Sequence, residues 1–281
     1  MNLRRIRLLL LLFAAILWNV LLTGYIEEKA LQINCFSYET AYQNFRDHQV
    51  KEKVLDAFYE AADADMEKFS ELLTMYFATG DTVTDVDVLE QDIAFVKKYK
   101  AEEFDCVKGY VYAVWNDLAR FPVGTVQSDK EATVSFADSW MQSRTFGSDR
   151  GHEGCDIMAS VDKRGIYPVY SATDGVVEQI GWLRLGGYRI GIRSESGAYF
   201  YYAHLAGYAK EFEIGEEVSA GTFLGYMGDT GYSDILGTTG NFPVHLHFGI
   251  YLNDRDGKEF SVNSYPAARY LWERQEEKLT E

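Results

Sequence analysis

The sequence predicts an α+β protein built from a transmembrane helix, a small helical segment, a mainly antiparallel β-sheet domain and a C-terminal helix. Two observations carry this prediction. An apolar run fills residues 8–26, and glycine is unevenly spread, with three of the 24 glycines in residues 27–146 and twenty in residues 147–257. Because glycine weakens helices and serves tight turns, the chain should change from helical to β-rich near residue 130. We therefore place the four parts at residues 1–26, 27–128, 129–260 and 261–281.

The apolar run has the length and the flanking charges of a membrane anchor. Its nineteen residues form a helix about as long as the hydrocarbon core of a bilayer is thick. Arg4, Arg5 and Arg7 precede the run, and Glu27 and Glu28 follow it. The positive-inside rule therefore places the N-terminus in the cytoplasm and the rest of the chain outside the membrane.

Two other interpretations of the N-terminus are weaker. A cleaved signal peptide requires a small-x-small site soon after the run, and neither residues 23–25 nor residues 28–30 provide a good one. A lipoprotein would be modified at Cys35, but this residue lies well past the run and follows Asn34. We therefore expect an uncleaved, single-pass signal anchor.

Composition excludes several classes of partner. Asp and Glu number 43 against 27 Lys and Arg, which gives a net charge of −16, and the basic excess is confined to residues 1–26. The exported part therefore lacks the basic face that a duplex nucleic acid requires, so no nucleic-acid partner is expected. With 3 Cys no complete disulfide framework can form, and a pairing of Cys35 with Cys106 is left open.

Apolar stripes predict three helices in the segment 27–128. They cover residues 54–77, 84–98 and 104–118. Gly80 should end the first helix, and Thr84 is a candidate N-cap for the second. We interpret this bundle as a stalk, a spacer or a surface for a protein partner, and we interpret His48 as a surface histidine without a chemical role.

Short β-type runs separated by glycine turns fill the part after residue 146. Runs of this length and spacing predict an antiparallel sheet or sandwich. They lie at residues 169–172, 175–178, 188–192, 199–203, 224–227 and 244–251. In the charged tail at residues 265–279, Ala268, Leu271 and Trp272 share one face, so a C-terminal helix is expected.

Four of the 5 histidines fall in the glycine-rich part. His152 and Asp156 form a His-x-x-x-Asp, and His204 lies at the end of a strand. His245 and His247 form a His-x-His, and since strand residues i and i+2 point to one face, these two imidazoles project together. Taken alone, the pair also fits a solvated polar face. Together the five groups suit Zn²⁺, which keeps three protein ligands in catalytic sites, and the surplus pair could serve proton transfer.

The order of several motifs gives a more specific signal. Residues 165–177 read GIYPVYSATDGVV, residues 202–205 YAHL, residues 214–221 IGEEVSAG and residues 224–231 LGYMGDTG, before HLHF at 245–248. Taken in this order, residues 129–260 resemble the lysostaphin-type (LytM-domain) zinc metalloendopeptidases, a family that cleaves peptidoglycan peptides. The resemblance implies a LytM-type peptidase fold similar to the duplicated hybrid motif.

The resemblance also implies a role for each polar residue. The family counterparts of His152, Asp156 and His247 bind one Zn²⁺ per chain, and those of His204 and His245 flank the metal-bound water. The implied reaction is attack of zinc-activated water on a peptide carbonyl, assisted by the two histidines that are not ligands. The implied partners are peptidoglycan peptides outside the membrane.

Three features depart from the family pattern. The stretch 230–243 is longer than the usual turn and is expected to border the substrate groove. Gly249 follows Phe248, where the family often has Glu. Cys155, next to Asp156, should face away from the site as a small buried residue, because neighbouring strand residues alternate.

Two alternatives to an enzyme outside the membrane are compatible with parts of the sequence. A non-catalytic scaffold or activator of cell-wall remodelling or sporulation machinery could use residues 27–128 as a docking surface. Retention of all three implied metal ligands counts against that function. An intracellular zinc hydrolase disagrees with the predicted anchor. The sequence leaves open which peptidoglycan bond is cleaved.

Overall fold

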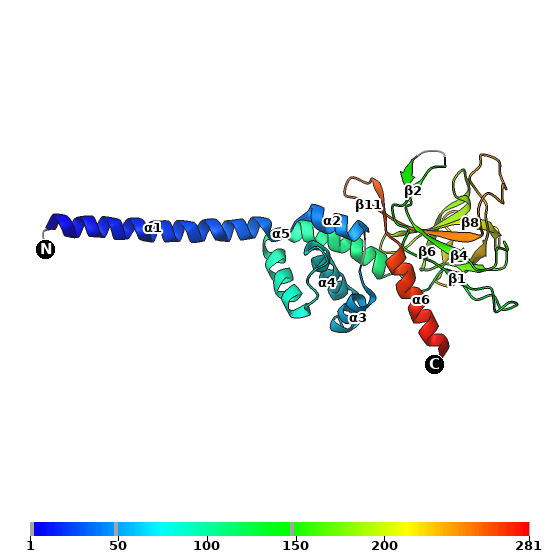
Figure 1. The fold of residues 1–281 in the computed structure, drawn as a ribbon, viewed down its shortest axis with the longest axis horizontal. Helices are drawn as coiled ribbons and strands as arrows, with labels where there is room; N and C mark the ends of the chain where they lie inside the picture. Colours follow the sequence, from blue (N-terminus) through cyan, green and yellow to red (C-terminus); the bar gives the residue numbers. More distant parts are fainter. Residues whose placement is uncertain (1–2, 48–49, 147–148, 281) are drawn as a thin grey trace.

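The computed structural model describes residues 3–47, 50–146 and 149–280. Helix α1 (Leu3–Asn34) projects from one end, the other helices of the N-terminal half lie in the middle, and the sheet forms the opposite end (Figure 1). The α+β architecture with a mainly antiparallel sheet is confirmed. His48 lies outside the described residues. The helices after α1 are α2 (Tyr38–Asp47), α3 (Glu52–Ala61), α4 (Met66–Ala78), α5 (Val86–Trp115) and α6 (Tyr265–Thr280).

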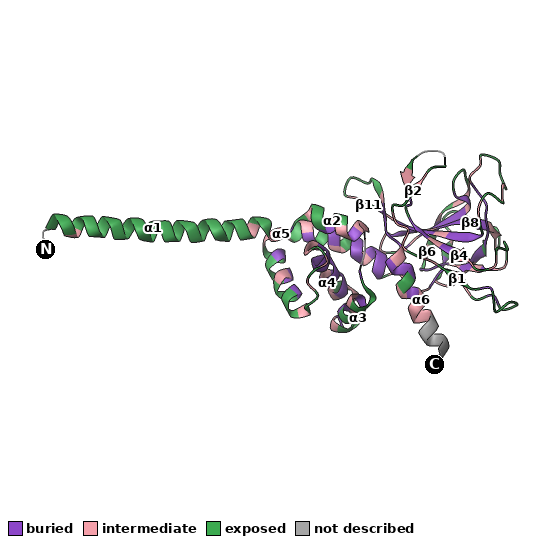
Figure 2. Ribbon diagram, in the orientation of Figure 1, coloured by how far each residue is buried: buried purple, intermediate pink, exposed green. Residues whose placement is uncertain are grey.

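Helix α1 contains the predicted membrane run and continues eight residues past Ile26. None of its residues is buried, and Figure 2 shows it exposed along its length. Within the part of the chain that the structure describes, it belongs to the one stretch of helix that is long and apolar enough to cross a membrane. Its length and composition are those of a membrane span.

The apolar stripe at residues 54–77 forms two helices, so the prediction of one helix was wrong. Between α3 and α4 the chain turns through Asp63 and Ala64, whose φ angles are 51° and 62°. Asp65 then accepts hydrogen bonds from two backbone amides and caps α4. Both helices bury their apolar residues in the same core, which is why the stripe continues across the turn.

The second and third predicted helices meet in α5, and a non-helical residue separates them between residues 98 and 104, where the break was predicted. The helix continues across a kink at Lys100, where φ is −138° and ψ is 32°. Its N-cap is Asp85 rather than Thr84. Helix α2, which the sequence analysis did not predict, buries Ala41 and Phe45 against this group of helices.

The strands form one antiparallel sheet of ten strands and a separate hairpin, β2–β3, among the described residues. The main order is β1-β4-β11-β8-β7-β6-β9, with β12 paired to β11 and with β10 paired to β5 and β8. Each of the six predicted runs overlaps a strand. The strands are β1 (Val134–Ser135), β2 (Ser143–Arg144), β3 (Arg150–Gly151), β4 (Cys155–Ala159), β5 (Pro168–Tyr170), β6 (Gly175–Leu183), β7 (Gly187–Arg193), β8 (Tyr199–Tyr208), β9 (Glu217–Val218), β10 (Phe223–Met227), β11 (His245–Asn253) and β12 (Glu259–Val262).

Alternation gives the central strands a buried face and an open face. Phe200 and Tyr202 on β8, Leu246 and Phe248 on β11 and Cys155 on β4 are completely buried. Burial of each large apolar side chain contributes roughly 1.5–3 kcal/mol to folding. Because this face is filled, the residues in between are directed to the opposite face, where the polar side chains gather. Cys155 faces away from that side, as expected.

The helical segment packs directly on the sheet domain. The ring of Phe260 on β12 lies 5.1 Å from that of Tyr42 and 5.2 Å from that of Tyr110, centroid to centroid. Trp115, at the end of α5, lies 5.5 Å from Tyr270 of α6. Buried residues of the helices and of the sheet form one continuous cluster. The predicted domain boundaries thus mark changes of secondary structure within a shared core, and they stay predictions.

Candidate active site

Neighbouring strands place a carboxylate opposite an imidazole. The register of β4 and β11 sets Asp156 directly across from His247. Since Leu246 and Phe248 point into the core, alternation turns His245 and His247 to the open face, as the His-x-His pattern predicts.

His152 joins this pair from the turn between β3 and β4. Its backbone N–H donates to the carbonyl of Gln142, and its carbonyl accepts from Met141. The Nε2 atom of His152 lies 2.9 Å from Oδ1 of Asp156 and 2.9 Å from Nδ1 of His247, and the last two atoms are 3.0 Å apart. Three potential ligand atoms therefore form a nearly equilateral triangle.

The triangle fits a tetrahedral zinc ion. Zinc bonds of about 2.0–2.1 Å to nitrogen or oxygen separate neighbouring ligand atoms by about 3.3 Å, close to the separations found here. Oγ and the carbonyl oxygen of Ser139 lie 2.9 and 3.2 Å from Nδ1 of His152. An N–H directed at this carbonyl leaves Nε2 with a lone pair for a metal. The donor set of two imidazoles and one carboxylate is one that zinc prefers.

The other two histidines lie beside the triangle. Nδ1 of His245 donates to the carbonyl of Pro243 at 2.8 Å, and its Nε2 lies 3.8 Å from Oδ1 of Asp156. Nδ1 of His204 donates to the carbonyl of Thr230, also at 2.8 Å. Because a carbonyl can only accept, each neutral ring carries its proton on Nδ1 and presents Nε2 as a proton acceptor.

A bulge in β8 brings His204 to the open face. Tyr199, Tyr201 and Ala203 line the groove by alternation, so regular backbone would turn His204 toward the core. Instead the φ of His204 is 63°, and the register between β7 and β8 shifts at this point. Ala203 and His204 therefore both line the groove, and Leu205 returns to the core. This bulge could not be predicted from a local pattern, because the residues that form it include no glycine.

Burial sets the charge state of the site. It lowers the pKa of His152 and of His245, and it places the pKa of His204 well below its ordinary value. Burial alone would raise the pKa of Asp156, but the neighbouring side chains of His152 and His247 outweigh it and hold this pKa below its usual range. These shifts favour neutral His152, His204 and His245 beside an ionised Asp156 at neutral pH, the forms that bind a cation.

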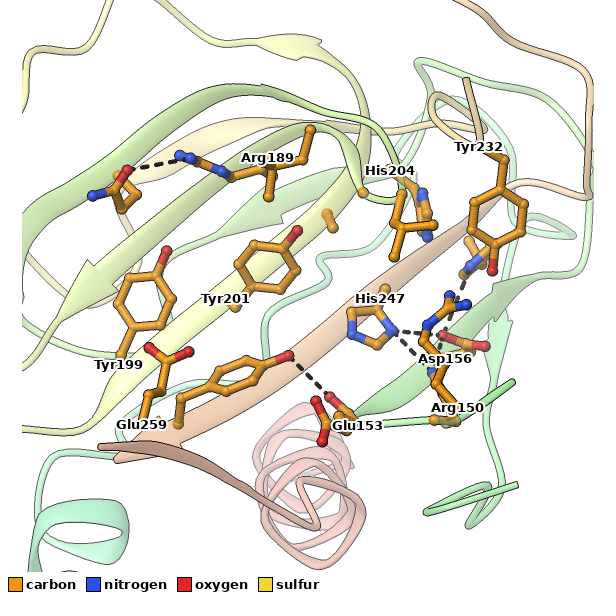
Figure 3. Close-up of a pocket in the computed structure, with 18 of the residues that line it drawn as sticks. Arg150, Glu153, Asp156, Arg189, Tyr199, Tyr201, His204, Tyr232, His247 and Glu259 are labelled. Carbon is orange, nitrogen blue, oxygen red and sulfur yellow. Dashed lines mark hydrogen bonds and ion pairs between the residues drawn. The ribbon is translucent and has the colours of Figure 1, made fainter. Parts of the chain in front are cut away.

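The cluster opens into a groove of about 590 Å³ on the face of the sheet (Figure 3). His204, His247 and Asp156 occupy one end, while Tyr199, Tyr201 and Arg189 lie toward the other. Tyr232, from the stretch 230–243, lines the groove next to the histidines. This stretch therefore borders the groove, as expected.

Two residues beside the cluster were not singled out in the sequence. Nη2 of Arg144 on β2 lies 2.6 Å from Oδ2 of Asp156, which leaves Oδ1 to the histidines. Gly154 lies against His247, since a Cβ there would be 2.6 Å from Cε1 and 2.7 Å from Nε2 of that ring. Arg144 comes from a separate hairpin, and Gly154 is one of many glycines, so neither carried a distinct signal.

Comparison with known proteins adds to this geometry. Residues 150–259 match the model of Peptidase family M23, and all five predicted site residues lie in this range. A solved LytM structure from Ruminococcus gnavus, provisionally named a glycyl-glycine endopeptidase, is 42% identical with a TM-score of 0.69. The alignment covers 82% of this chain and 90% of that chain.

Two curated relatives are also similar. The L-Ala–D-Glu endopeptidase of Bacillus subtilis is 45% identical over 142 residues, which cover 50% of this chain and 41% of that protein. Glycyl-glycine endopeptidase ALE-1 of Staphylococcus capitis is 32% identical over 99 residues, which cover 34% of this chain and 24% of that protein. This chain therefore spans less than half the length of these relatives.

Proposed function

This chain belongs to peptidase family M23, and from this premise we propose that it is a membrane-anchored zinc endopeptidase that hydrolyses peptide bonds of peptidoglycan outside the cytoplasmic membrane. The observation that carries the proposal is the triangle of His152, Asp156 and His247 at the end of a groove. M23 peptidases are zinc-dependent, and these residues form a donor set that fits zinc.

Each site residue has a proposed task. His152, Asp156 and His247 would hold zinc through Nε2, Oδ1 and Nδ1. When bound, zinc supplies Lewis-acid chemistry, which polarises a peptide carbonyl and makes water more acidic. His204 and His245 present Nε2 atoms that can take a proton from the attacking water and return it to the leaving amine. The carbonyls of Thr230 and Pro243 keep these two rings oriented.

The relatives favour a peptidoglycan substrate. One is named for an L-Ala–D-Glu bond and the other for a glycyl-glycine bond. We propose cleavage in the stem peptide on the 45% identity to the first relative; the Ruminococcus gnavus structure, provisionally named for a glycyl-glycine bond, is 42% identical, so the test must distinguish the two bonds. Helix α1 would hold the sheet domain on the side of the membrane where this substrate lies.

Zinc-loaded full-length protein in detergent, incubated with purified sacculi, tests this activity. We expect soluble peptides, and mass spectrometry of their new N-termini would distinguish a stem bond (D-Glu) from a cross-bridge bond (Gly). Asp156→Asn should lose both zinc and peptide release. Asp149→Asn, which removes an exposed carboxylate, is the matched control. Zinc-loaded wild-type protein that releases no peptide would overturn the proposal and favour a scaffold.

The membrane placement needs a separate test. We expect the full chain to stay with membranes after a high-salt wash and the sheet domain to be digested by protease added to protoplasts. Deletion of residues 1–26 should release the protein from the membrane fraction. Protection of the sheet domain in intact protoplasts would contradict the proposed topology.

A further inference from the structure

One side chain in the groove carries a positive charge that the described part of the chain does not neutralise. Arg189 of β7 lines the groove and is only 9% exposed. Its Nη2 donates to the neutral Oε1 of Gln179 at 3.2 Å, while its Nη1 is buried without a hydrogen-bond partner. The neighbouring Glu178 pairs with Arg193 instead, through two bonds of 2.6 and 2.7 Å.

A buried guanidinium without a counter-charge is unfavourable. Arginine stays protonated at any physiological pH, so deprotonation cannot remove the unfavourable buried charge of Arg189. Burial of a charge is tolerated when the charge is paired and fully hydrogen-bonded. Gln179 supplies no charge, so an anion that entered the groove would provide the counter-charge that the described residues do not supply.

Arg189 lies on the same face of the sheet as the histidine cluster. Its strand, β7, pairs with β8 at the bulge. On the other side of β8, Ala203 pairs with His247 of β11, and His247 pairs with Asp156 of β4. Adjacent strands lie about 4.8 Å apart, so the backbone of Arg189 is roughly 10 Å from that of His247. An extended peptide rises about 3.3 Å per residue, which puts Arg189 within about three residues of the bond that reacts.

Two tyrosines shape the surroundings of Arg189. A Cβ at Gly186 would lie 2.3 Å from the hydroxyl of Tyr201, and one at Gly191 would lie 1.9 Å from the hydroxyl of Tyr199. These glycines let both phenols approach β7 on either side of Arg189 along the chain. Burial raises the pKa of both hydroxyls, that of Tyr199 to about 12, so they stay protonated and can donate hydrogen bonds.

The other unpaired acids of the groove do not fill this position. Figure 3 shows Glu153 and Glu259 on the side of Tyr201 away from Arg189. Both acids would repel a carboxylate placed near them. The region around Arg189, with its guanidinium and two phenol donors, is therefore the part of the groove that favours an anionic group.

We propose that Arg189 determines specificity by binding a free carboxylate of the peptide substrate. The carboxylate takes the place of the Gln179 carbonyl on Nη2 and also pairs with Nη1, in the bidentate geometry that arginine favours. This inference rests on the proposed endopeptidase function and deepens it. It names the substrate class as peptides with a free carboxylate close to the cleaved bond, in preference to amidated stems or uncharged glycine bridges.

Two batches of the same sacculi test the inference, one untreated and one amidated with carbodiimide and ammonium chloride to convert free carboxyls to carboxamides. With zinc-loaded full-length protein, the initial rate of peptide release should be about tenfold or more higher on the untreated batch. Arg189→Gln should lower the rate on untreated sacculi by a similar factor and leave the rate on amidated sacculi unchanged. For this variant, the ratio of the rate on untreated sacculi to the rate on amidated sacculi would then be about one.

Two further variants separate a specific pairing from a general effect of charge. Arg184→Gln removes an arginine whose side chain is 56% exposed, and it should leave the preference unchanged. Gln179→Glu supplies a counter-charge within the chain, so it should raise the melting temperature and reduce the preference for free carboxylates. The melting temperature reports on the pairing even if Arg189→Gln folds poorly.

The outcomes distinguish this inference from the function on which it rests. Equal wild-type rates on the two batches would overturn the inference alone, and so would an Arg189→Gln variant that slows both batches in proportion. No release from either batch by the zinc-loaded wild type would overturn the endopeptidase function and this inference with it.

Discussion

At the scale of single residues, the five polar side chains divide into two groups. Three ligand-type atoms, on His152, Asp156 and His247, lie within 3.0 Å of one another. His204 and His245 lie outside this triangle, each fixed by a hydrogen bond from Nδ1 to a backbone carbonyl. Substitutions in the two groups should therefore affect metal binding and turnover differently.

His204→Ala should abolish most turnover and keep the zinc. Loss of a positioned proton-transfer group typically lowers the rate by about 10²–10⁴-fold, whereas loss of a ligand also removes the metal. Peptide release and zinc content per chain should be measured together, with Asp156→Asn as the comparison. If His204→Ala lost zinc to the same extent as Asp156→Asn, His204 would be a ligand instead.

Gly154→Ala should weaken zinc binding although residue 154 offers no ligand. The added Cβ would lie 2.6 Å from Cε1 of His247 and 2.9 Å from the carbonyl of Phe248, so the imidazole must move. Supports of this kind typically change metal affinity by about 10–100-fold. Competition with a zinc chelator measures the loss. Gly207→Ala on β8, where a Cβ meets nothing within 4 Å, is the matched control and should bind zinc as the wild type does.

Sequence motifs predict some features of these side chains and not others. The five site residues were identified because they fall in ordered motifs, and the His-x-His pair follows from strand alternation. The face on which His204 lies depends on a bulge, and the contacts of Arg144 and Arg189 depend on strand neighbours that are distant in sequence. Such contacts leave no local pattern, so neither arginine could be recognised from the sequence.

At the scale of elements, the long strands of the sheet were predicted, whereas β4, the shortest strands and the break between α3 and α4 were not. A strand register such as that of β11 against β4 is constrained by one buried face, and a shift by one residue would bury the histidines. An apolar stripe does not define where a helix ends, because two successive helices that pack on the same core can continue the same helical spacing of apolar residues. The break between α3 and α4 is set by positive φ angles at Asp63 and Ala64, neither of which is a glycine.

Asp81, just after α4, should make the helical segment less stable at neutral pH. Its Oδ1 is buried without a partner, and burial together with the nearby Asp47 raises its pKa from 3.8 to about 6. The folded state thus holds this proton more tightly than the unfolded state does. The resulting stabilisation is complete below about pH 3.8 and is lost as the pH rises through about 6.

Asp81→Asn should therefore raise the melting temperature at pH 7.5 and have little effect near pH 4. Asparagine tolerates the φ of 61° at this position. Thermal unfolding of the full-length chain, followed by circular dichroism at both pH values, measures the difference. The exposed Asp149→Asn serves as control and should show no such difference. An increase in melting temperature that is as large at pH 4 as at pH 7.5 would contradict a raised pKa of Asp81 as the cause.

At the scale of the whole molecule, the helical segment is joined to β12, the strand next to β11, which carries His245 and His247. Phe260 lies on β12, which pairs with β11, and its ring packs against Tyr42 and Tyr110 from α2 and α5. Nε of Arg46 also donates to the carbonyl of Ser261 at 3.1 Å. The sequence predicted helices and a sheet but gave no indication that they share a core, because contacts between distant segments leave no periodic signal.

Phe260→Ala should uncouple the two halves. Removal of this partly buried ring should cost about 3 kcal/mol, the lower end of the range for Phe→Ala changes in cores. Because the ring joins helices to sheet, the single unfolding transition expected of a shared core should separate into two, observed by calorimetry of the full-length chain. Phe95→Ala, which removes an aromatic ring from the exposed side of α5, should lower stability less and keep one transition. One unshifted transition in Phe260→Ala would mean that other contacts, such as that of Trp115 with Tyr270, hold the halves together.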